Sequence, residues 1–357
     1  MSYTNGLDKP TDYFNTKLYT GNGTTNAITG VGFQPDLVWG KKRDSAGHSQ
    51  LYDNVRGVRK IINSSLINAE VTESSGYGLE SFDSDGFTLG ADPLVASGSI
   101  NASGGTYASW NWLASNTTAS NTDGSITSTV SANTTSGFSI VSYTGTGSAG
   151  TVGHGLGSDL KMVIIKNRDS ADNWEVYHSS VITSDNQTLN LDNTNALFTR
   201  GTASWDISEF SSSVIGLNTN SAVNSSSVNY IAYCFAEKKG FSKFGSYTGN
   251  GSSDGTFVYT GFKPSYFLLK SSSNAESWHI YDNQRANAYN PHETYSPTAN
   301  DSSAEATASS YGIDFVSNGV KLRGSGSGIN GSGYTYIYMA FAENPFVTST
   351  GIPTTAR

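Results

Sequence analysis

Paired carboxylates are the side chains of this sequence best suited to acid–base chemistry. Glycosidases, for example, need two carboxylates about 5 to 10 Å apart across the scissile bond. Three close pairs have this potential: Glu70/Glu73, Asp83/Asp85 and Asp169/Asp172. None has the same partner geometry repeated elsewhere in the chain, and acidic residues at this density are expected on any water-exposed surface. We therefore predict that the protein is not an enzyme, and we assign no catalytic residue.

Metal and cofactor sites are equally weakly supported. The segment Asp83-Ser84-Asp85-Gly86 is similar to the start of a calcium loop, but calcium needs six to eight oxygen ligands and the later acidic ligands are absent. Asp-Gly between apolar residues favours a hairpin turn instead. The five histidines lack the spacing of a transition-metal site, and no G-x-S-x-G motif supports a serine nucleophile. We expect no bound metal and no cofactor.

The strongest pattern in the sequence is a motif that occurs three times. Tyr-Thr-Gly-x-Gly stands at residues 19–23, 143–147 and 247–251. A second tyrosine and then a closing aromatic follow at nearly constant distances, about 34 and about 93 residues after the first tyrosine. The second tyrosines are Tyr52, Tyr177 and Tyr281, and the closing aromatics are Trp112, Phe235 and Phe341. The chain is therefore predicted to be a tandem array of one module.

Some positions repeat in all three copies, whereas one charged segment repeats in only two. The lysine eleven residues before the second tyrosine is constant: Lys41, Lys166 and Lys270. Arg-Asp-Ser-Ala occurs at 43–46 and 168–171, but the third copy has Ser-Ser-Asn-Ala at 272–275. A repeated framework with variable charges suits a scaffold better than a triplicated active site. The tyrosine-glycine motif is interpreted as a strand-end turn, because no helix is expected after it to cradle a phosphate.

Composition and turn signals indicate the fold class. The chain of 357 residues has 39 glycines, 8 prolines and 12% aromatic residues, and it lacks long stretches of helical periodicity. Asp85-Gly86 and Asn318-Gly319 between apolar runs are hairpin signals. The segments 107–112, 230–235 and 336–341 are aromatic and read as buried strands. We predict an all-β protein of three tandem antiparallel β-sandwich or jelly-roll-like modules.

The repeat also sets the expected domain boundaries. An N-terminal arm (1–16) precedes copy one (17–115), a Ser/Thr/Asn-rich linker (116–137) follows, and copies two (138–240) and three (241–346) precede a C-terminal tail (347–357). For residues 116–137, a β-arm lying against a neighbour is the competing interpretation, because Ile126 and Val130 interrupt the polar run. Copy one departs most from the others and is expected to be the copy specialised for attachment.

Charge and targeting signals restrict the partners. The net charge of −8 and the lack of a basic stripe argue against nucleic-acid binding. The single cysteine, Cys234, excludes an internal disulfide and lies in an apolar run, so we expect it to be buried. The N-terminal sequence has no signal-peptide pattern and no stretch is long enough to span a membrane. We therefore expect synthesis in a cytoplasm, without a secretory signal and without membrane insertion.

Two tryptophans are candidates for binding. Trp174 and Trp278 lie three residues before the second tyrosine in copies two and three, where copy one has Ser49. Next to Ser and Asn they could stack on a sugar, which makes them possible glycan contacts. The other interpretation, favoured by the size of the side chain, is that both fill the sandwich core.

The repeated phrases are similar to those of a known group of proteins. Tyr-Thr-Gly-Asn-Gly (19–23), Gly-Phe-Gln-Pro-Asp-Leu-Val-Trp-Gly-Lys-Lys-Arg-Asp (32–44) and the closing Tyr-x-Tyr-x-Ala-Phe-Ala-Glu-Asn-Pro-Phe (336–346) resemble modules in virion proteins of tailed bacteriophages, especially marine and cyanobacterial ones. The resemblance covers about residues 17–346. Such modules are similar to parts of tail fibres, receptor-binding proteins or capsid decorations, and they have no assigned catalytic residue to carry over.

The resemblance implies a function and a location. We expect a non-enzymatic structural protein on the surface of a phage particle, made in the host cytoplasm and located in the virion. Its expected partners are further copies of itself, as a homo-oligomer, and other virion proteins. The alternative is a lectin-like carbohydrate-binding protein that recognises a host surface glycan.

Overall fold

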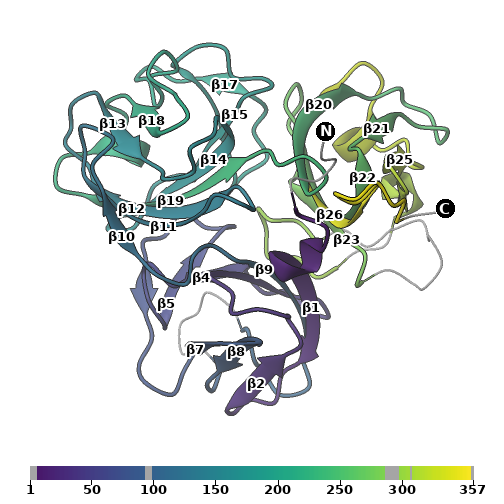
Figure 1. The fold of residues 1–357 in the computed structure, drawn as a ribbon, viewed down its shortest axis with the longest axis horizontal. Coiled ribbons are helices and arrows are strands. Elements are labelled where there is room, and N and C mark those ends of the chain that lie inside the picture. The colour runs from purple at the N-terminus through teal and green to yellow at the C-terminus, as the bar shows by residue number, and fades with distance from the viewer. Residues whose placement is uncertain (1–5, 93–98, 286–296, 306–307, 355–357) are drawn as a thin grey trace.

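Antiparallel β-sheets supply nearly all of the regular structure of this chain (Figure 1). The computed structural model describes residues 6–92, 99–285, 297–305 and 308–354. Helix within these ranges is limited to single turns: the 3-10 helices η1 (Pro10–Asp12) and η2 (Ser309–Tyr311), and the α-helices α1 (Ser221–Asn224) and α2 (Ser327–Asn330). The predicted class, all-β with antiparallel sandwiches, is confirmed.

Copy one forms a larger sheet and a smaller one. The larger has the strand order β1-β9-β3-β4-β5-β6, and the smaller has the order β2-β8-β7. The strands are β1 (Phe14–Thr20), β2 (Asn26–Thr29), β3 (Leu37–Lys42), β4 (Gln50–Asp53), β5 (Lys60–Asn63), β6 (Val71–Thr72), β7 (Leu79–Asp83), β8 (Gly86–Leu89) and β9 (Thr106–Trp112).

Copies two and three also have a larger and a smaller sheet. In copy two the orders are β10-β11-β12-β19-β14-β15-β16-β17 and β13-β18, and in copy three they are β20-β26-β22-β23 and β21-β25-β24. The strands of the second copy are β10 (Ala119–Asn121), β11 (Ser128–Asn133), β12 (Phe138–Thr144), β13 (Gly150–Gly153), β14 (Leu160–Asn167), β15 (Glu175–His178), β16 (Gln187–Asn190), β17 (Phe198–Thr199), β18 (Val214–Leu217) and β19 (Asn229–Ala236). The strands of the third copy are β20 (Ser242–Thr248), β21 (Phe257–Tyr259), β22 (Phe262–Ser271), β23 (His279–Asp282), β24 (Ile313–Val316), β25 (Gly319–Leu322) and β26 (Thr335–Pro345).

Four strands of each larger sheet follow one order. The order is the strand that ends in the repeated Tyr-Thr, the closing aromatic strand, the strand whose second-last residue is the constant lysine, and the strand of the second tyrosine: β1-β9-β3-β4, β12-β19-β14-β15 and β20-β26-β22-β23. Each second tyrosine pairs with the lysine strand, and the pairs are Val38↔Tyr52, Val163↔Tyr177 and Phe267↔Tyr281. The landmarks of the sequence repeat therefore occupy corresponding strands.

The expected hairpins form, but their turns lie one residue earlier than the Asp-Gly and Asn-Gly signals suggested. Asp83 pairs with Gly86, so the two turn residues are Ser84 and Asp85, and the glycine begins the returning strand. Val316 and Gly319 pair in the same way in copy three. A Cβ on Gly86 would lie 1.9 Å from the carbonyl oxygen of Ile28, so the glycine is needed for the close approach of β2.

The interpretation of residues 116–137 as a flexible linker is wrong. This segment contains β10 and β11, and β11 pairs with β12 over the whole range from Ser128↔Tyr143 to Asn133↔Phe138. Its start is held by the buried carboxylate of Asp36, which accepts hydrogen bonds from the backbone N–H groups of Ala114 and Asn116. The alternative interpretation, a β-arm, describes the segment, because Val130 can be buried when the strand lies on an existing sheet.

Each copy packs its smaller sheet against one face of its larger sheet. The side chains between the two sheets form a separate apolar cluster in each copy. Examples are Phe87 in copy one, Trp205 in copy two and Phe267 in copy three, each fully buried. These three clusters are the sandwich cores that the alternating strands predict.

A fourth cluster lies between the copies and contains residues from all three. At its centre are the closing aromatics Trp112, Phe235 and Phe341. The distance between ring centroids is 5.8 Å for Trp112–Phe341, 6.4 Å for Trp112–Phe235 and 6.2 Å for Phe235–Phe341. In Figure 1 the three copies surround this centre as lower (purple), upper left (teal) and right (green to yellow) lobes. The copies are thus arranged around a common core rather than strung along a line.

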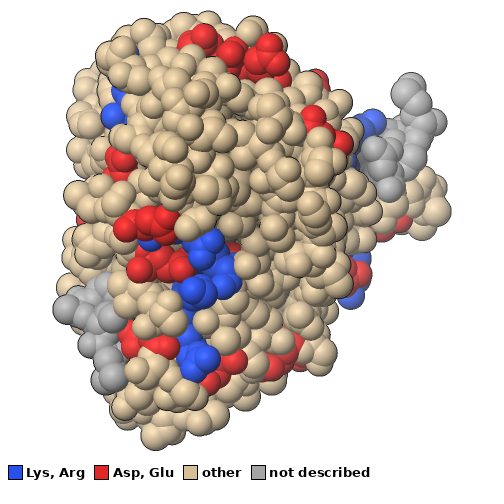
Figure 2. All heavy atoms as spheres, turned by 90° about the vertical axis from the view of Figure 1, so that its left-hand side faces the viewer, with Lys and Arg blue, Asp and Glu red and all other residues tan. Residues whose placement is uncertain are grey.

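One face of the molecule is mainly uncharged (Figure 2). Figure 2 shows one face on which the Lys and Arg side chains that gather near its middle adjoin Asp and Glu side chains. That mixture gives no extended basic surface on this face. Among the residues that the structure describes, no helix has the length and apolar character needed to cross a membrane.

The central aromatic contact leads to a stability prediction. Replacing Phe341, which is 1% exposed, with alanine should lower the free energy of unfolding by about 3 to 5 kcal/mol, because it opens a cavity among three sheets. Urea unfolding followed by tryptophan fluorescence measures the change. Phe346→Ala is the matched control, since Phe346 is 41% exposed, and it should cost less than about 1 kcal/mol. Equal losses in the two variants would contradict a common core.

Candidate functional site

The repeated Tyr-Thr-Gly-x-Gly motif forms a turn that is fixed by a buried asparagine. In copy one Tyr19 stacks on Tyr107 at 5.1 Å, and the side chain of Asn101 accepts a hydrogen bond from Asn22 N (3.1 Å) and donates one to Thr24 O (2.6 Å). The corresponding tyrosine stacks are Tyr143–Tyr230 and Tyr247–Tyr336, and the corresponding asparagines are Asn224 and Asn330. An asparagine 81 to 83 residues after the first tyrosine is present in the sequence of each copy, but it is not among the predicted landmarks.

The glycines of the motif serve backbone geometry. A Cβ on Gly21 would lie 2.3 Å from Ala102 O, and Gly145 and Gly249 face backbone oxygens at the same distance. The last glycine of the motif has a positive φ in all three copies, +75° at Gly23 for example. These contacts explain the glycines by the geometry of the turn.

The constant lysines join neighbouring copies. Lys41 is buried, and its Nζ donates to Gly47 O (2.7 Å) in its own copy and to Asp301 O (2.9 Å) in copy three. The other two lysines repeat this arrangement: Lys166 donates to Ile67 O of copy one at 2.9 Å, and Lys270 donates to Thr194 O of copy two at 3.2 Å. Copy one therefore contacts copy three, copy two contacts copy one and copy three contacts copy two, which closes a ring.

Burial changes the acid–base properties of these amines. It lowers the pKa of Lys41 and Lys166 to about 8 and that of Lys270 to about 7. Desolvation is the main cause in each case, because the charged ammonium loses its water shell. Carbonyl oxygens replace part of that water as hydrogen-bond acceptors.

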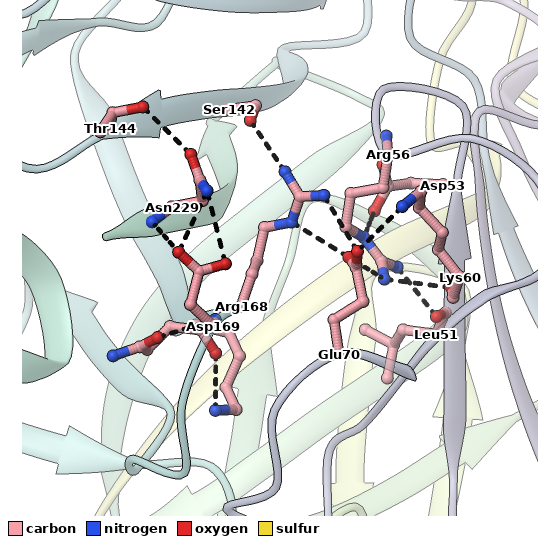
Figure 3. A network of polar contacts seen from close by, with 12 residues as sticks. Leu51, Asp53, Arg56, Lys60, Glu70, Ser142, Thr144, Arg168, Asp169 and Asn229 are labelled. Atoms are coloured by element: carbon pink, nitrogen blue, oxygen red, sulfur yellow. Dashed lines mark hydrogen bonds and ion pairs between the residues drawn. The ribbon is translucent and has the colours of Figure 1, made fainter. Parts of the chain in front are cut away.

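An arginine–glutamate network lies beside the lysine in two of the three contacts. Glu70 of copy one accepts from Arg168 of copy two at 3.0 Å and from Arg56 and Lys60 of its own copy at 3.3 Å (Figure 3). Burial raises the pKa of Glu70, but these cations together hold it below its ordinary value. The Glu70 carboxylate is therefore a charged link between two copies.

The other two contacts show which part of this network is variable. Glu305 of copy three accepts from Arg43 of copy one at 3.0 Å and from Arg285 at 2.8 Å, so this contact repeats the charged link. In both charged contacts the glutamate N–H also donates to the backbone oxygen of the arginine in the other copy, Glu70 to Arg168 at 2.9 Å and Glu305 to Arg43 at 3.0 Å. Between copies three and two this backbone bond runs from Leu197 N to Ser272 O (2.9 Å), with Leu and Ser in place of Glu and Arg. The loss of Arg-Asp-Ser-Ala in copy three thus accompanies the loss of its glutamate partner.

The residue after each second tyrosine also reaches the next copy. Asp53 accepts from Tyr233 Oη of copy two (2.8 Å), and Asp282 accepts from Trp110 Nε1 of copy one (2.9 Å). In copy two this residue is His178, whose Nε2 lies 3.2 Å from Tyr338 O of copy three. Burial lowers the pKa of His178 to about 4, so the ring is neutral and Nε2 donates to the carbonyl.

Trp174 and Trp278 are not surface platforms for sugars. They are 0% and 1% exposed, and each indole belongs to a contact between copies. Trp174 Nε1 donates to Asn63 O of copy one (2.9 Å), and Trp278 Nε1 donates to Asn190 O of copy two (2.8 Å). The glycan-contact hypothesis for these two residues is wrong, because neither ring face is accessible.

Most carboxylates of the pairs named from the sequence accept hydrogen bonds within the fold. Apart from Glu70, four of them bind within the fold: Asp83 accepts from Ser81 and Thr88, Asp85 from Gly30 N and Gly32 N, Asp169 from Asn229 N, and Asp172 from Ser221 Oγ. Glu73 is buried. In the described parts of the chain, no cluster of three or more His, Cys, Asp or Glu residues could hold a metal ion.

Comparison with known proteins adds a family but no activity. A family model described as "Domain of unknown function (DUF7483)" matches residues 9–345. No curated protein and no solved structure matches the chain.

The charged links lead to a second stability prediction. Glu70→Gln should lower the free energy of unfolding by about 2 to 3 kcal/mol, because it leaves Arg56 and Arg168 without their shared carboxylate in a mostly buried site. Glu343→Gln is the control, because the Lys263–Glu343 pair is about one-third exposed, and it should cost less than about 1 kcal/mol. Chemical unfolding of both variants measures the difference, and equal values would contradict a role for Glu70 in joining the copies.

The buried lysines predict a pH dependence. The unfolded chain keeps the Lys270 proton up to pH 10.5 or so, whereas the folded chain releases it near pH 7. The unfolded state therefore binds more protons between these values, and the free energy of unfolding should rise with pH by up to about 1.4 kcal/mol per unit for this lysine. Urea unfolding of wild type and Lys270→Met from pH 7 to 9.5 should show a steeper rise in wild type. Lys263→Met, at a partly exposed position, should leave the slope unchanged, and parallel curves for wild type and Lys270→Met would refute the prediction.

Proposed function

The chain belongs to this family of unknown function, and we propose that it is a non-enzymatic structural protein on the surface of a tailed-bacteriophage particle. Its partners in this proposal are further copies of itself and other virion proteins. The resemblance of its repeated phrases to virion modules supports the location. The contacts of its charged residues support the structural role.

The observation that carries the proposal is that the repeated polar groups bind neighbouring copies. The lysines that recur in all three copies each bind the backbone of a neighbouring copy. Glu70 and Glu305 each link arginines of two copies. These side chains hold the three copies together in a ring. A catalytic acid or base must instead be able to exchange a proton with a substrate.

The physical character of the protein fits a particle component. The four apolar clusters give a closed body in which the strands of three copies support one another. Cys234 is buried, and burial raises the pKa of its thiol well above its usual range, so stability in this structure comes from packing and not from a disulfide. Such a body needs no oxidising compartment in which to fold.

Copy one, which is expected to be specialised for attachment, is not a separate module in the fold, because it shares contacts with both other copies. Trp112 of copy one lies in the central core against Phe235 and Phe341, and Glu70 binds Arg168 of copy two. Removing residues 1–115 would expose that core and leave buried charges unpaired. In this proposal, attachment uses the outer surface of the closed body.

The proposal is tested on phage particles produced from a genome that encodes the chain. Particles purified by density gradient should contain the chain in a fixed ratio to the major capsid protein, and gold-labelled antibody should mark it on intact particles. Absence from purified particles, together with abundance in the lysate of infected cells, would reject a virion location. Release of reducing ends from host polysaccharide by the purified chain would reject the non-enzymatic part.

A further inference from the structure

The outer face of the smaller sheet in copy three carries two exposed aromatic rings. Phe257 is 44% exposed and Tyr259 is 62% exposed, whereas Val258 between them is 4% exposed. Because side chains alternate along a strand, the two rings project from the same face of β21 and Val258 packs inward. We call Phe257 and Tyr259 the aromatic face.

Glycines beneath the rings bring them close to the backbone. A Cβ on Gly319, the cross-strand partner of Tyr259, would lie 2.9 Å from the Phe257 ring. A Cβ on Gly261 would lie 3.5 Å from Tyr259 Oη. The rings therefore lie against the sheet backbone, and this arrangement leaves a broad part of their surface open to solvent.

Charged groups of both signs adjoin the aromatic face. Lys321, which pairs with Phe257 across the sheet, forms an ion pair of 2.8 Å with Asp254. The Asp254 side chain is 87% exposed, so its carboxylate remains accessible to a ligand. Donors and acceptors of hydrogen bonds thus stand at the edge of an apolar surface.

The fold does not require these rings. The corresponding strands β2 and β13 keep the buried central residue as Ile28 and Val152. The positions that flank it are Ala27 and Thr29 in copy one, and Thr151 and Gly153 in copy two. Two large apolar side chains on the solvent side of one copy alone have no stabilising role that the other copies share.

We propose that the aromatic face of copy three binds a neutral oligosaccharide. The C–H groups of a pyranose ring pack on an open aromatic ring, and its hydroxyl groups exchange hydrogen bonds with Asp254 and Lys321. An apolar partner would cover this ion pair without replacing its water, which is costly. A strongly charged ligand would be attracted by one member of the Asp254–Lys321 pair and repelled by the other, so the pair does not favour it.

This binding is a property of the isolated chain and does not depend on its location in a virion. Purified full-length chain is titrated with maltohexaose, cellohexaose, mannohexaose and chitohexaose, and binding is followed by calorimetry. At least one should bind, and Tyr259→Ala and Phe257→Ala should each weaken its affinity at least tenfold. Phe346→Ala removes an exposed ring outside the aromatic face and should leave the affinity unchanged.

Three outcomes would overturn the proposal. The first is that none of the four oligosaccharides binds. The second is that neither Tyr259→Ala nor Phe257→Ala weakens the affinity. The third is concentration-dependent self-association in sedimentation that Tyr259→Ala abolishes, since this would assign the face to a second copy of the chain. Unfolding transitions of the variants should match wild type, because both side chains lie outside the apolar clusters of the fold.

The two proposals can fail separately. If the chain is absent from purified particles but binds an oligosaccharide, the virion location is rejected and the binding proposal stands.

Discussion

The packing of Trp112, Phe235 and Phe341 against one another is the contact on which the rest of the structure depends. It places the closing strand of each copy at a common centre, so each larger sheet is covered on both faces. One face packs on the smaller sheet of its own copy, and the other packs on the neighbouring copies. This double burial explains why β14 and β22 are apolar on both faces and do not alternate with polar residues.

Apolar packing at the centre is not directional, and polar contacts fix how the copies are arranged around it. Each constant lysine and each residue after a second tyrosine has its partner in an adjacent copy. A shift of one copy would leave these buried groups without partners, at a cost larger than that of any single apolar contact. The contact between copies two and three keeps the same backbone bond with Leu197 and Ser272, so the charged side chains are not needed to form it.

The contacts between copies also distinguish side chains with a structural role from side chains that are exposed. Lysines, arginines, glutamates and tryptophans that recur at matching positions bind other parts of the chain. Phe257 and Tyr259, which do not recur and have no such contact, lie on the surface. In a chain of repeats, departures from the repeat are therefore the better guide to recognition, because the shared positions are already constrained by the fold.

The sequence alone determined the fold class, the hairpins and the landmark residues of the repeat, because hydrophobic alternation and glycine turns are local properties. It did not determine that the copies share one core, that residues 116–137 add strands to copy two, or that Trp174 and Trp278 are buried between copies. Those facts depend on contacts between residues distant in the chain. A tryptophan that stacks on a sugar and one that fills an interface have the same local sequence, and only the position of the neighbouring copy decides between them.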